Sequence, residues 1–344
     1  MPVADLMHEW FETELLAASI AAAGVSGTMF GPWSAGSALV LLLREAHRRL
    51  GVGAQVRGGP GGLTAAMARA AESAGAQIRT GSSVERILVR NERAVGVALS
   101  SGEELAARAI VSSADPKTTF LKLVDPVDLT PDFLTKIRNY RSHGTVAKVN
   151  LALSGLPAFA GASGPESLTG RIHIGPEIDY LERAFDHAKY GEMSSEPWLD
   201  VVIPSILDPQ LAPQGGHVAS VYAHYAPYTL RGTTWASARN VLLQTVIRTL
   251  ARHAPGIEAQ IVGAQVLTPV ELERDYGFSG GHIFHGELAL DQLLATRPIL
   301  GYAHYRSPVE GLYLCSAGTH PGGFFTGGSG RNAALAIVRE LKAR

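Results

Sequence analysis

The C-terminal stretch, residues 311–344, constrains the fold of this 344-residue chain more than any other segment. It begins with a short apolar run, Leu312–Cys315, which predicts a buried strand. A loop with six glycines lies between 318 and 330, and the apolar residues that follow have helical spacing (Ala334, Leu335, Ile337, Val338 and Leu341). A strand, a glycine-rich turn and a helix bring backbone N–H groups and a helix N-terminus together, which suits a phosphate or another electron-rich group. The alternative is a plain turn, since glycines are common in turns of every kind.

The residues of this loop are more informative than its glycine content. Residues 313–323 read Tyr-Leu-Cys-Ser-Ala-Gly-Thr-His-Pro-Gly-Gly, and Thr-Gly and Gly-Arg-Asn-Ala-Ala follow. This wording resembles the C-terminal flavin motif of the phytoene desaturase-like FAD oxidoreductases. Further segments resemble the same family in its own order, so that the resemblance covers nearly the whole chain (58–67, 75–80, 111–119, 268–273, 280–288 and 297–305). It implies FAD as the cofactor, an apolar small-molecule substrate, and hydride removal from that substrate to the flavin.

The resemblance also implies a fold of the α/β class with mixed α+β character. The chain would be the C-terminal part of a two-domain FAD/NAD(P)-binding-type oxidoreductase, with a discontinuous partial FAD domain and a mixed-sheet substrate domain. We expect residues 1–57 and 120–310 in the substrate domain, and residues 58–119 and 311–344 in the FAD domain. The strands expected within 84–112 would then share a domain with the C-terminal strand and helix, because each is too short to bury its apolar face alone.

Periodicity and turn residues predict the individual elements. Helices are expected at 4–23, 37–50, 64–74 and 237–253. Strands are expected at 76–80, 84–90, 94–99, 104–106, 108–112, 146–153, 199–204 and 217–226.

Enzymes of this kind begin with Gly-x-Gly-x-x-Gly after a strand, followed about 20 residues later by an acid for the ribose. This chain opens instead with Met1–Trp10, which is acidic and helical in pattern. We therefore expect a truncated or shortened relative that binds FAD weakly or not at all by itself. The segment 58–63, Gly-Gly-Pro-Gly-Gly-Leu, is not a substitute, because Pro60 lacks a backbone donor and no acid ends the next predicted strand. Two functions stay open: a flavin-dependent oxidoreductase, or a flavin-free binding or assembly module.

The resemblance assigns roles to particular residues. The backbone of one glycine-rich set would lie along the isoalloxazine ring and ribityl chain (Gly318, Thr319, Gly322, Gly323, Gly327 and Gly328). Val84 would meet the adenine through its backbone. His282, His285 and His320 would line the substrate side and hydrogen-bond the substrate or transfer a proton. A zinc site at His282 and His285 would need a helix, which the glycines around them oppose, so no metal is expected. A purely structural loop is the alternative.

Composition narrows the remaining classes. The net charge of −1 excludes a nucleic-acid footprint. The single cysteine, Cys315, stands in an apolar run; it excludes a disulfide framework and is expected in the core. No signal-peptide pattern and no apolar stretch of about 20 residues is visible, which favours a cytoplasmic protein. Peripheral membrane contact and a homo-oligomer stay open.

Overall fold

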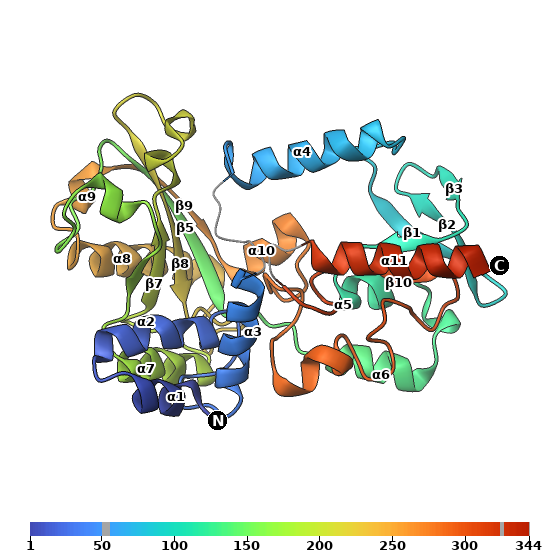
Figure 1. Cartoon of the computed structure of the whole chain (residues 1–344), viewed down its shortest axis with the longest axis horizontal. Coiled ribbons are helices and arrows are strands. Elements are labelled where there is room, and N and C mark those ends of the chain that lie inside the picture. The colour runs from blue at the N-terminus through green and yellow to red at the C-terminus, as the bar shows by residue number, and fades with distance from the viewer. Residues whose placement is uncertain (50–55, 324–326, 344) are drawn as a thin grey trace. The chain divides into compact units, whose positions relative to one another are not determined.

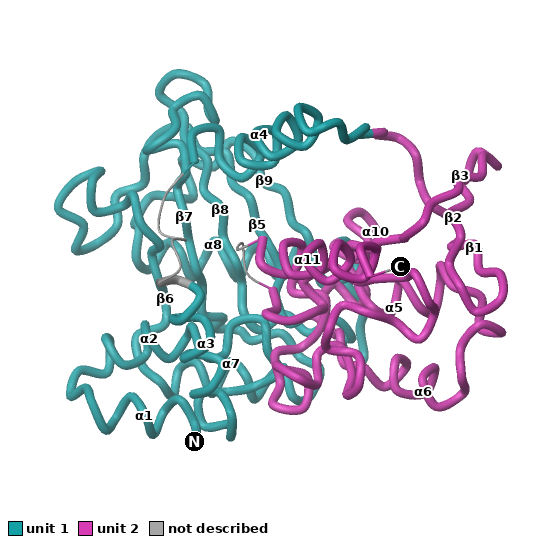
Figure 2. Tube along the Cα trace, turned by 45° about the vertical axis from the view of Figure 1, so that its right-hand side comes forward, with its two compact units in different colours: residues 1–78, 145–271 teal, residues 79–144, 272–344 magenta. Residues whose placement is uncertain are grey.

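The structure is a computed structural model that describes residues 1–49, 56–323 and 327–343 (Figure 1). These residues form two compact units, and each unit combines two separate stretches of chain (Figure 2). Unit 1 comprises residues 1–78 and 145–271, and unit 2 comprises residues 79–144 and 272–344. The units divide the chain near 78, 144 and 271, and the domain borders expected near 57, 119 and 310 stay a prediction. What each unit binds stays a prediction.

Unit 1 is built on a five-stranded sheet in which all neighbouring strands are antiparallel. The strand order is β6 (Ile172–Ile174), β7 (Trp198–Val202), β8 (His217–His224), β5 (Val146–Leu153) and β9 (Ile261–Leu267). Side chains alternate between the two faces of a strand. One face carries paired apolar residues such as Val149 and Val221, and it shares a core with helix α8 (Trp235–Ala251).

Four helices form a second core in unit 1 together with Trp198 and Tyr225. They are α1 (Val3–Trp10), α2 (Glu14–Val25), α3 (Ser37–Arg49) and α7 (Ile178–Lys189) (Figure 1). The single helix expected at 4–23 was wrong. Phe11 and Thr13 adopt extended backbone angles, and Phe11 packs on this core, so the chain forms two helices.

Helix α4 (Gly59–Ser73) begins earlier than expected and has no buried residue among those described. The strand expected at 76–80 does not form. All five of its residues are exposed, so its apolar pattern finds no sheet to join within the described part of the chain. No helix of the described residues is both long and apolar enough to cross a bilayer.

Unit 2 contains two small sheets. Strands β1 (Val84–Arg90), β2 (Arg93–Leu99) and β3 (Glu104–Ala106) form an antiparallel meander, as expected. Strand β4 (Ile110–Ser112) pairs in parallel with β10 (Leu312–Leu314), with Ile110 opposite Leu312. This pairing confirms that the C-terminal strand belongs with the strands of the 84–112 region. One hydrophobic core lies under both sheets. It contains Phe120 and, from helix α6 (Pro131–Asn139), Phe133 and Ile137.

Two expectations about the C-terminal segment were wrong. Helix α11 (Gly328–Ala343) forms, but its expected apolar face is largely uncovered: Leu335 is 43% and Val338 49% exposed. The buried residues printed for this helix are instead Ser329 and Ala333, on its N-terminal half. Cys315 is only half-buried rather than a core residue, and burial raises the pKa of its thiol.

Candidate flavin and substrate site

The glycine-rich loop leaves strand β10 as a tight turn held by its own polar groups. The Ser316 carbonyl accepts hydrogen bonds from the Thr319 amide (3.0 Å) and the Thr319 hydroxyl (2.8 Å). The Ser316 hydroxyl accepts from the Gly318 amide at 3.0 Å. Thr319 is completely buried, so its side chain fixes the turn and does not face a ligand. Ser329 then donates to the carbonyls of Thr319 and His320, at 3.4 and 3.3 Å, and this ties the start of α11 to the loop.

The glycines of this loop serve different purposes. A Cβ atom at Gly318 would lie 2.5 Å from Pro116 Cδ, and one at Gly323 would overlap Phe284. These two glycines therefore allow the protein to pack on itself. At Gly327 (φ +64°) and at Gly330 a Cβ would meet nothing within 4 Å. Among the described residues of the loop, the space open to a ligand is thus at Gly327 and at Gly330.

Helix α11 begins at this open point. It starts at Gly328, and its first turn carries two glycines and Ser329, whose side chain is turned inward onto the loop. Backbone N–H groups of a first helical turn lack intrahelical partners and attract electron-rich groups. Exposed backbone without side chains, at the N-terminus of a long helix, fits the edge of a flavin ring. Gly322, at φ +105°, lies further back, where a Cβ would sit 3.6 Å from Arg297 Nε.

The segment 279–287 packs directly on the glycine-rich loop, because Phe284 fills the space beside Gly323. Its start is held by Asp115, a buried carboxylate that accepts from the Ser279 hydroxyl at 2.9 Å and the Ser279 amide at 3.3 Å. The Gly280 carbonyl accepts from the Gly144 amide at 2.8 Å. The segment is not helical, and no cluster of three or more His, Cys, Asp or Glu side chains suited to a metal occurs in the described residues.

The three candidate histidines differ in their surroundings. His282 is 1% exposed, and its Nδ1 accepts a hydrogen bond from the Phe284 amide at 3.1 Å, which suits a loop-fixing role. His285 is partly exposed; its ring centre lies 5.4 Å from that of Phe278, and burial lowers the pKa of its imidazole. The His320 carbonyl accepts from the Tyr305 hydroxyl at 3.0 Å, and its side chain is half-buried. The role of each histidine stays a prediction.

Sequence reasoning missed Arg297, which is 0% exposed. Its guanidinium donates six hydrogen bonds to five backbone carbonyls, all between 2.8 and 3.2 Å (Phe284, Gly286, Glu287, Gln292 and Ala317). It therefore fastens the 284–292 segment to the start of the glycine-rich loop. The available signal was a charged residue within an apolar run, 293–300, which is unusual unless its polar groups are fully bonded.

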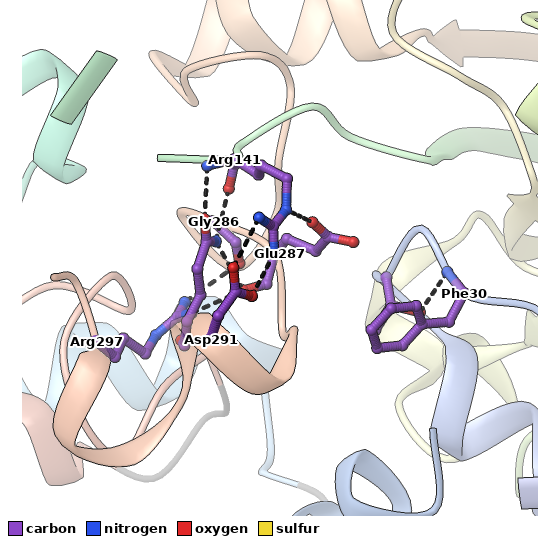
Figure 3. Close-up of polar contacts among 8 residues, drawn as sticks. Phe30, Arg141, Gly286, Glu287, Asp291 and Arg297 are labelled. Carbon is purple, nitrogen blue, oxygen red and sulfur yellow. Dashed lines mark hydrogen bonds and ion pairs between the residues drawn. The ribbon is translucent and has the colours of Figure 1, made fainter. Parts of the chain in front are cut away.

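A second arginine, Arg141, holds the same segment from the outside (Figure 3). Its Nε donates to Glu287 Oε2 at 2.6 Å and its Nη1 to Asp291 Oδ2 at 2.9 Å. Its amide donates to Gln292 Oε1 at 2.7 Å. The hydrogen bond from Arg141 lowers the pKa of the Asp291 carboxyl.

Val84, the residue expected at the adenine, begins strand β1 and is 37% exposed. A hollow of about 510 Å³ opens in the same unit and is lined by Glu85, Arg86, Ala98 and residues 121–126. Whether adenine lies beside Val84 stays a prediction.

Unit 1 has a polar surface that the strand patterns did not single out. Opposite the apolar face of its sheet, Lys148 Nζ lies 5.3 Å from the centre of the Tyr222 ring, and Asn150 donates to Gln265 at 3.0 Å. Lys148, Asn150 and Tyr222 are half-buried. Alternation alone predicts solvent at such positions, so this partial burial could not be foreseen. This face is a second candidate surface for a substrate.

At one end of that face the polar groups are deeply buried. Asp200 lies with one oxygen 3.6 Å from His173 Nδ1 and the other 3.8 Å from His224 Nε2. The His224 ring stacks on Trp198, with centroids 3.6 Å apart and planes 4° from parallel. Burial lowers the pKa of His224 to about 3.

Comparison with known proteins decides the family. The family model for flavin-containing amine oxidoreductases matches residues 14–338. The chain belongs to this family. Pyridine nucleotide-disulfide oxidoreductase domain-containing protein 2 of Rattus norvegicus is 39% identical over 354 residues, which cover 99% of this chain and 61% of that protein. A neurosporene-forming phytoene desaturase of Cereibacter sphaeroides is 28% identical over 296 residues, which cover 83% of this chain and 53% of that protein.

The solved structures agree on the fold of this family member. An oxidoreductase from Methanosarcina mazei matches with a TM-score of 0.60 at 16% identity, covering 98% of this chain and 70% of that one. This likeness confirms the α/β fold class and no more. Membership of the flavin-containing amine oxidoreductases confirms the resemblance to FAD enzymes and makes FAD the implied cofactor. The chain spans less than two thirds of the length of the curated relatives described here.

Proposed function

We propose that this protein acts as an FAD-dependent oxidoreductase of the dehydrogenase or desaturase type, removing hydride from an apolar small molecule. The observation that supports this most directly is the open turn at the start of α11, where a Cβ at Gly327 or at Gly330 would meet nothing within 4 Å among the described residues. Family membership supplies the nature of the group that would fill it. When bound, a flavin accepts hydride, and the protein's part is to bind, orient and exclude water.

Different residues of unit 2 would bind the flavin, orient the substrate and exclude water. The backbone of Gly327, Gly328 and Gly330 would hold the electron-rich edge of the ring at the start of the helix. Phe284 closes the opposite side of the loop, where its ring fills the space beside Gly323. His285 offers an imidazole nitrogen for a proton or a substrate hydrogen bond.

Gly330→Ala tests the proposal because stability and cofactor affinity should change in opposite directions. Gly330 lies in a helix, its φ is outside the left-handed region, and a Cβ there meets nothing within 4 Å. Alanine should therefore stabilise the protein by about 0.5–1 kcal/mol through helix propensity. The added methyl group should weaken FAD binding at least tenfold. Thermal unfolding and titration of FAD by fluorescence measure the two effects.

Ala334→Gly is the matched control, one turn further along the same exposed face. It should destabilise the protein by about 1 kcal/mol and leave FAD affinity unchanged. If Gly330→Ala binds FAD as tightly as the wild type, the open turn is not the flavin site.

A flavin-free binding or assembly module is the second candidate function. It is favoured by the uncovered faces of α4 and α11, since exposed apolar helix faces mark interaction surfaces. The 344 residues also contain no Gly-x-Gly-x-x-Gly turn. We therefore expect the purified polypeptide to bind FAD weakly and to self-associate. Its visible absorption spectrum and its mass by light scattering test both; a yellow, stoichiometric monomer would contradict this expectation.

The remaining partners are proposals of the same kind. The substrate would be an apolar small molecule, and no nucleic-acid partner is proposed. Peripheral membrane contact and a homo-oligomer are both open to test. A cytoplasmic location is proposed from the single cysteine, which leaves no disulfide framework that would need an oxidising compartment.

A further inference from the structure

His285 has an unusual backbone that its neighbours impose. Its φ is +57°, in the left-handed region that residues other than glycine seldom adopt. Its amide donates to the His282 carbonyl at 2.9 Å, and its carbonyl accepts from the Tyr140 hydroxyl at 3.0 Å. Strained residues persist only where their surroundings over-determine them, and they concentrate at functional sites.

The peptides on both sides of His285 are fixed as well. Arg297 Nη2 donates to the carbonyls of Phe284, at 2.8 Å, and Gly286, at 3.2 Å. Tyr140 is 2% exposed and packs so closely on Gly286 that a Cβ there would overlap its hydroxyl. Tyr140 and Arg297 therefore hold three consecutive carbonyls, 284–286, in a single arrangement.

The side chain of His285 is equipped for proton transfer. Its Nδ1 is buried and has no hydrogen-bond partner among the described residues. A buried ring nitrogen without a partner is costly unless a ligand completes it. Burial is the main cause that lowers the pKa of this imidazole; of the two charged groups that act on it, Asp115 favours its protonation and Arg297, with a smaller effect, disfavours it. The imidazole is thus kept neutral, with a lone pair or a proton available at Nδ1.

We propose that Tyr140 and Arg297 are the positioning residues of His285, and that His285 Nδ1 takes the proton that leaves the substrate. This rests on the proposed function. Forming a C=C bond removes two hydrogens from adjacent carbons: one leaves as hydride to the flavin, and the other as a proton. The electron pair of the second C–H bond becomes the π bond, and His285 becomes imidazolium. Tyr140 fixes where the imidazole lies, and Arg297 fixes the peptides on both sides of it.

The first test needs no cofactor. NMR of histidine-labelled protein, with the His285 signal assigned from His285→Gln, follows the protonation of this imidazole. Arg297→Gln removes the neighbouring charge and should raise the pKa of His285, whereas Arg297→Lys should restore the wild-type value. If Arg297 has only a structural role, the pKa of His285 should be the same in both variants. That result would refute an electrostatic effect of Arg297 on the imidazole. If neither variant folds, Asp115→Asn is the second test. It removes the other charge that acts on the imidazole and should lower the pKa of His285. An unchanged pKa of His285 would contradict the proposal.

Tyr140→Phe tests positioning, since it removes one hydroxyl and keeps the ring. Amide hydrogen exchange at residues 285–287 should accelerate about fivefold, as expected for one lost hydrogen bond. With the protein carrying FAD, His285→Gln should lower turnover about 100-fold and leave FAD affinity unchanged. The pH profile of turnover should also lose the step that reports a basic group. Unchanged turnover, or a loss of FAD affinity instead, would refute the role of His285. Failure of the proposed function itself would show separately, as absent FAD binding by the wild type and an unaffected Gly330→Ala variant.

Discussion

Gly286→Ala should destabilise unit 2 by about 3–6 kcal/mol, the sum of overpacking, a lost buried hydrogen bond and backbone strain. The new Cβ would overlap the Tyr140 hydroxyl, and Gly286 has φ +142°, which L-residues rarely adopt. Tyr140 has nowhere to move, because it is buried and its hydroxyl bonds the His285 carbonyl. Denaturant unfolding followed by hydrogen exchange in residues 79–144 and 272–344 measures the loss.

Gly301→Ala is the control that separates backbone strain at a positive φ from the overlap of a new Cβ with Tyr140. Gly301 also has a positive φ, +94°, but a Cβ there meets nothing within 4 Å. Its replacement should cost only about 1–2 kcal/mol, the price of backbone strain alone. Equal losses for the two variants would show that the Tyr140 contact contributes nothing. A Tyr140→Ala background should remove most of the extra cost of Gly286→Ala, because neighbouring substitutions couple.

Acid should destabilise unit 1 through His224. Burial lowers the pKa of this residue to about 3 in the folded protein, against about 6.5 in the unfolded chain. Below pH 6.5 the unfolded chain therefore binds a proton that the folded protein does not. Stability is complete above pH 6.5 and falls by about 1.4 kcal/mol per pH unit as the pH drops toward 3, a total of about 4–5 kcal/mol. Asp200 adds to this loss at lower pH, since the charged and polar groups around it, first His173, lower the pKa of its carboxyl.

His224→Phe should flatten this dependence between pH 6.5 and 4. The phenyl ring can keep the stacking on Trp198 but carries no proton. Urea unfolding at several pH values gives the slope. Leu199→Val, in the neighbouring strand, is the control: it should lower stability by about 1 kcal/mol at every pH and leave the slope unchanged. A His224→Phe variant with the wild-type slope would contradict the assignment.

Local sequence patterns predicted the elements whose signals are local. The meander of unit 2 was expected because turn residues separate short alternating strands, and its strands β1 to β3 form as predicted. Helix α8 was expected within two residues at each end. The strand at 76–80 failed because an apolar run becomes a strand only beside a partner. The borders of the compact units could not be read from local patterns, because they depend on contacts between distant segments.

The candidate site was foreseen in outline and not in its chemistry. The order of glycines identified the turn, but only the space around each Cβ separates Gly323, which faces Phe284, from Gly330, which faces open space. His282 and His285 are equivalent in the sequence, whereas burial and a hydrogen bond to Nδ1 distinguish them in the structure. Arg297 escaped notice because its partners are backbone carbonyls, which no side-chain pattern can indicate.

The pairing of β4 with β10 sets the order in which the protein can form during synthesis. Ile110 must wait for Leu312, so the two strands meet only after Leu312 has left the ribosome. All residues of unit 1 are available once residue 271 has emerged. When segments far apart in sequence come together, closing the long loop between them lowers the chain entropy before their contacts can offset that loss. The nascent chain therefore carries the 79–144 segment as an unfinished half-domain, which makes it a natural substrate for chaperones until β10 has emerged.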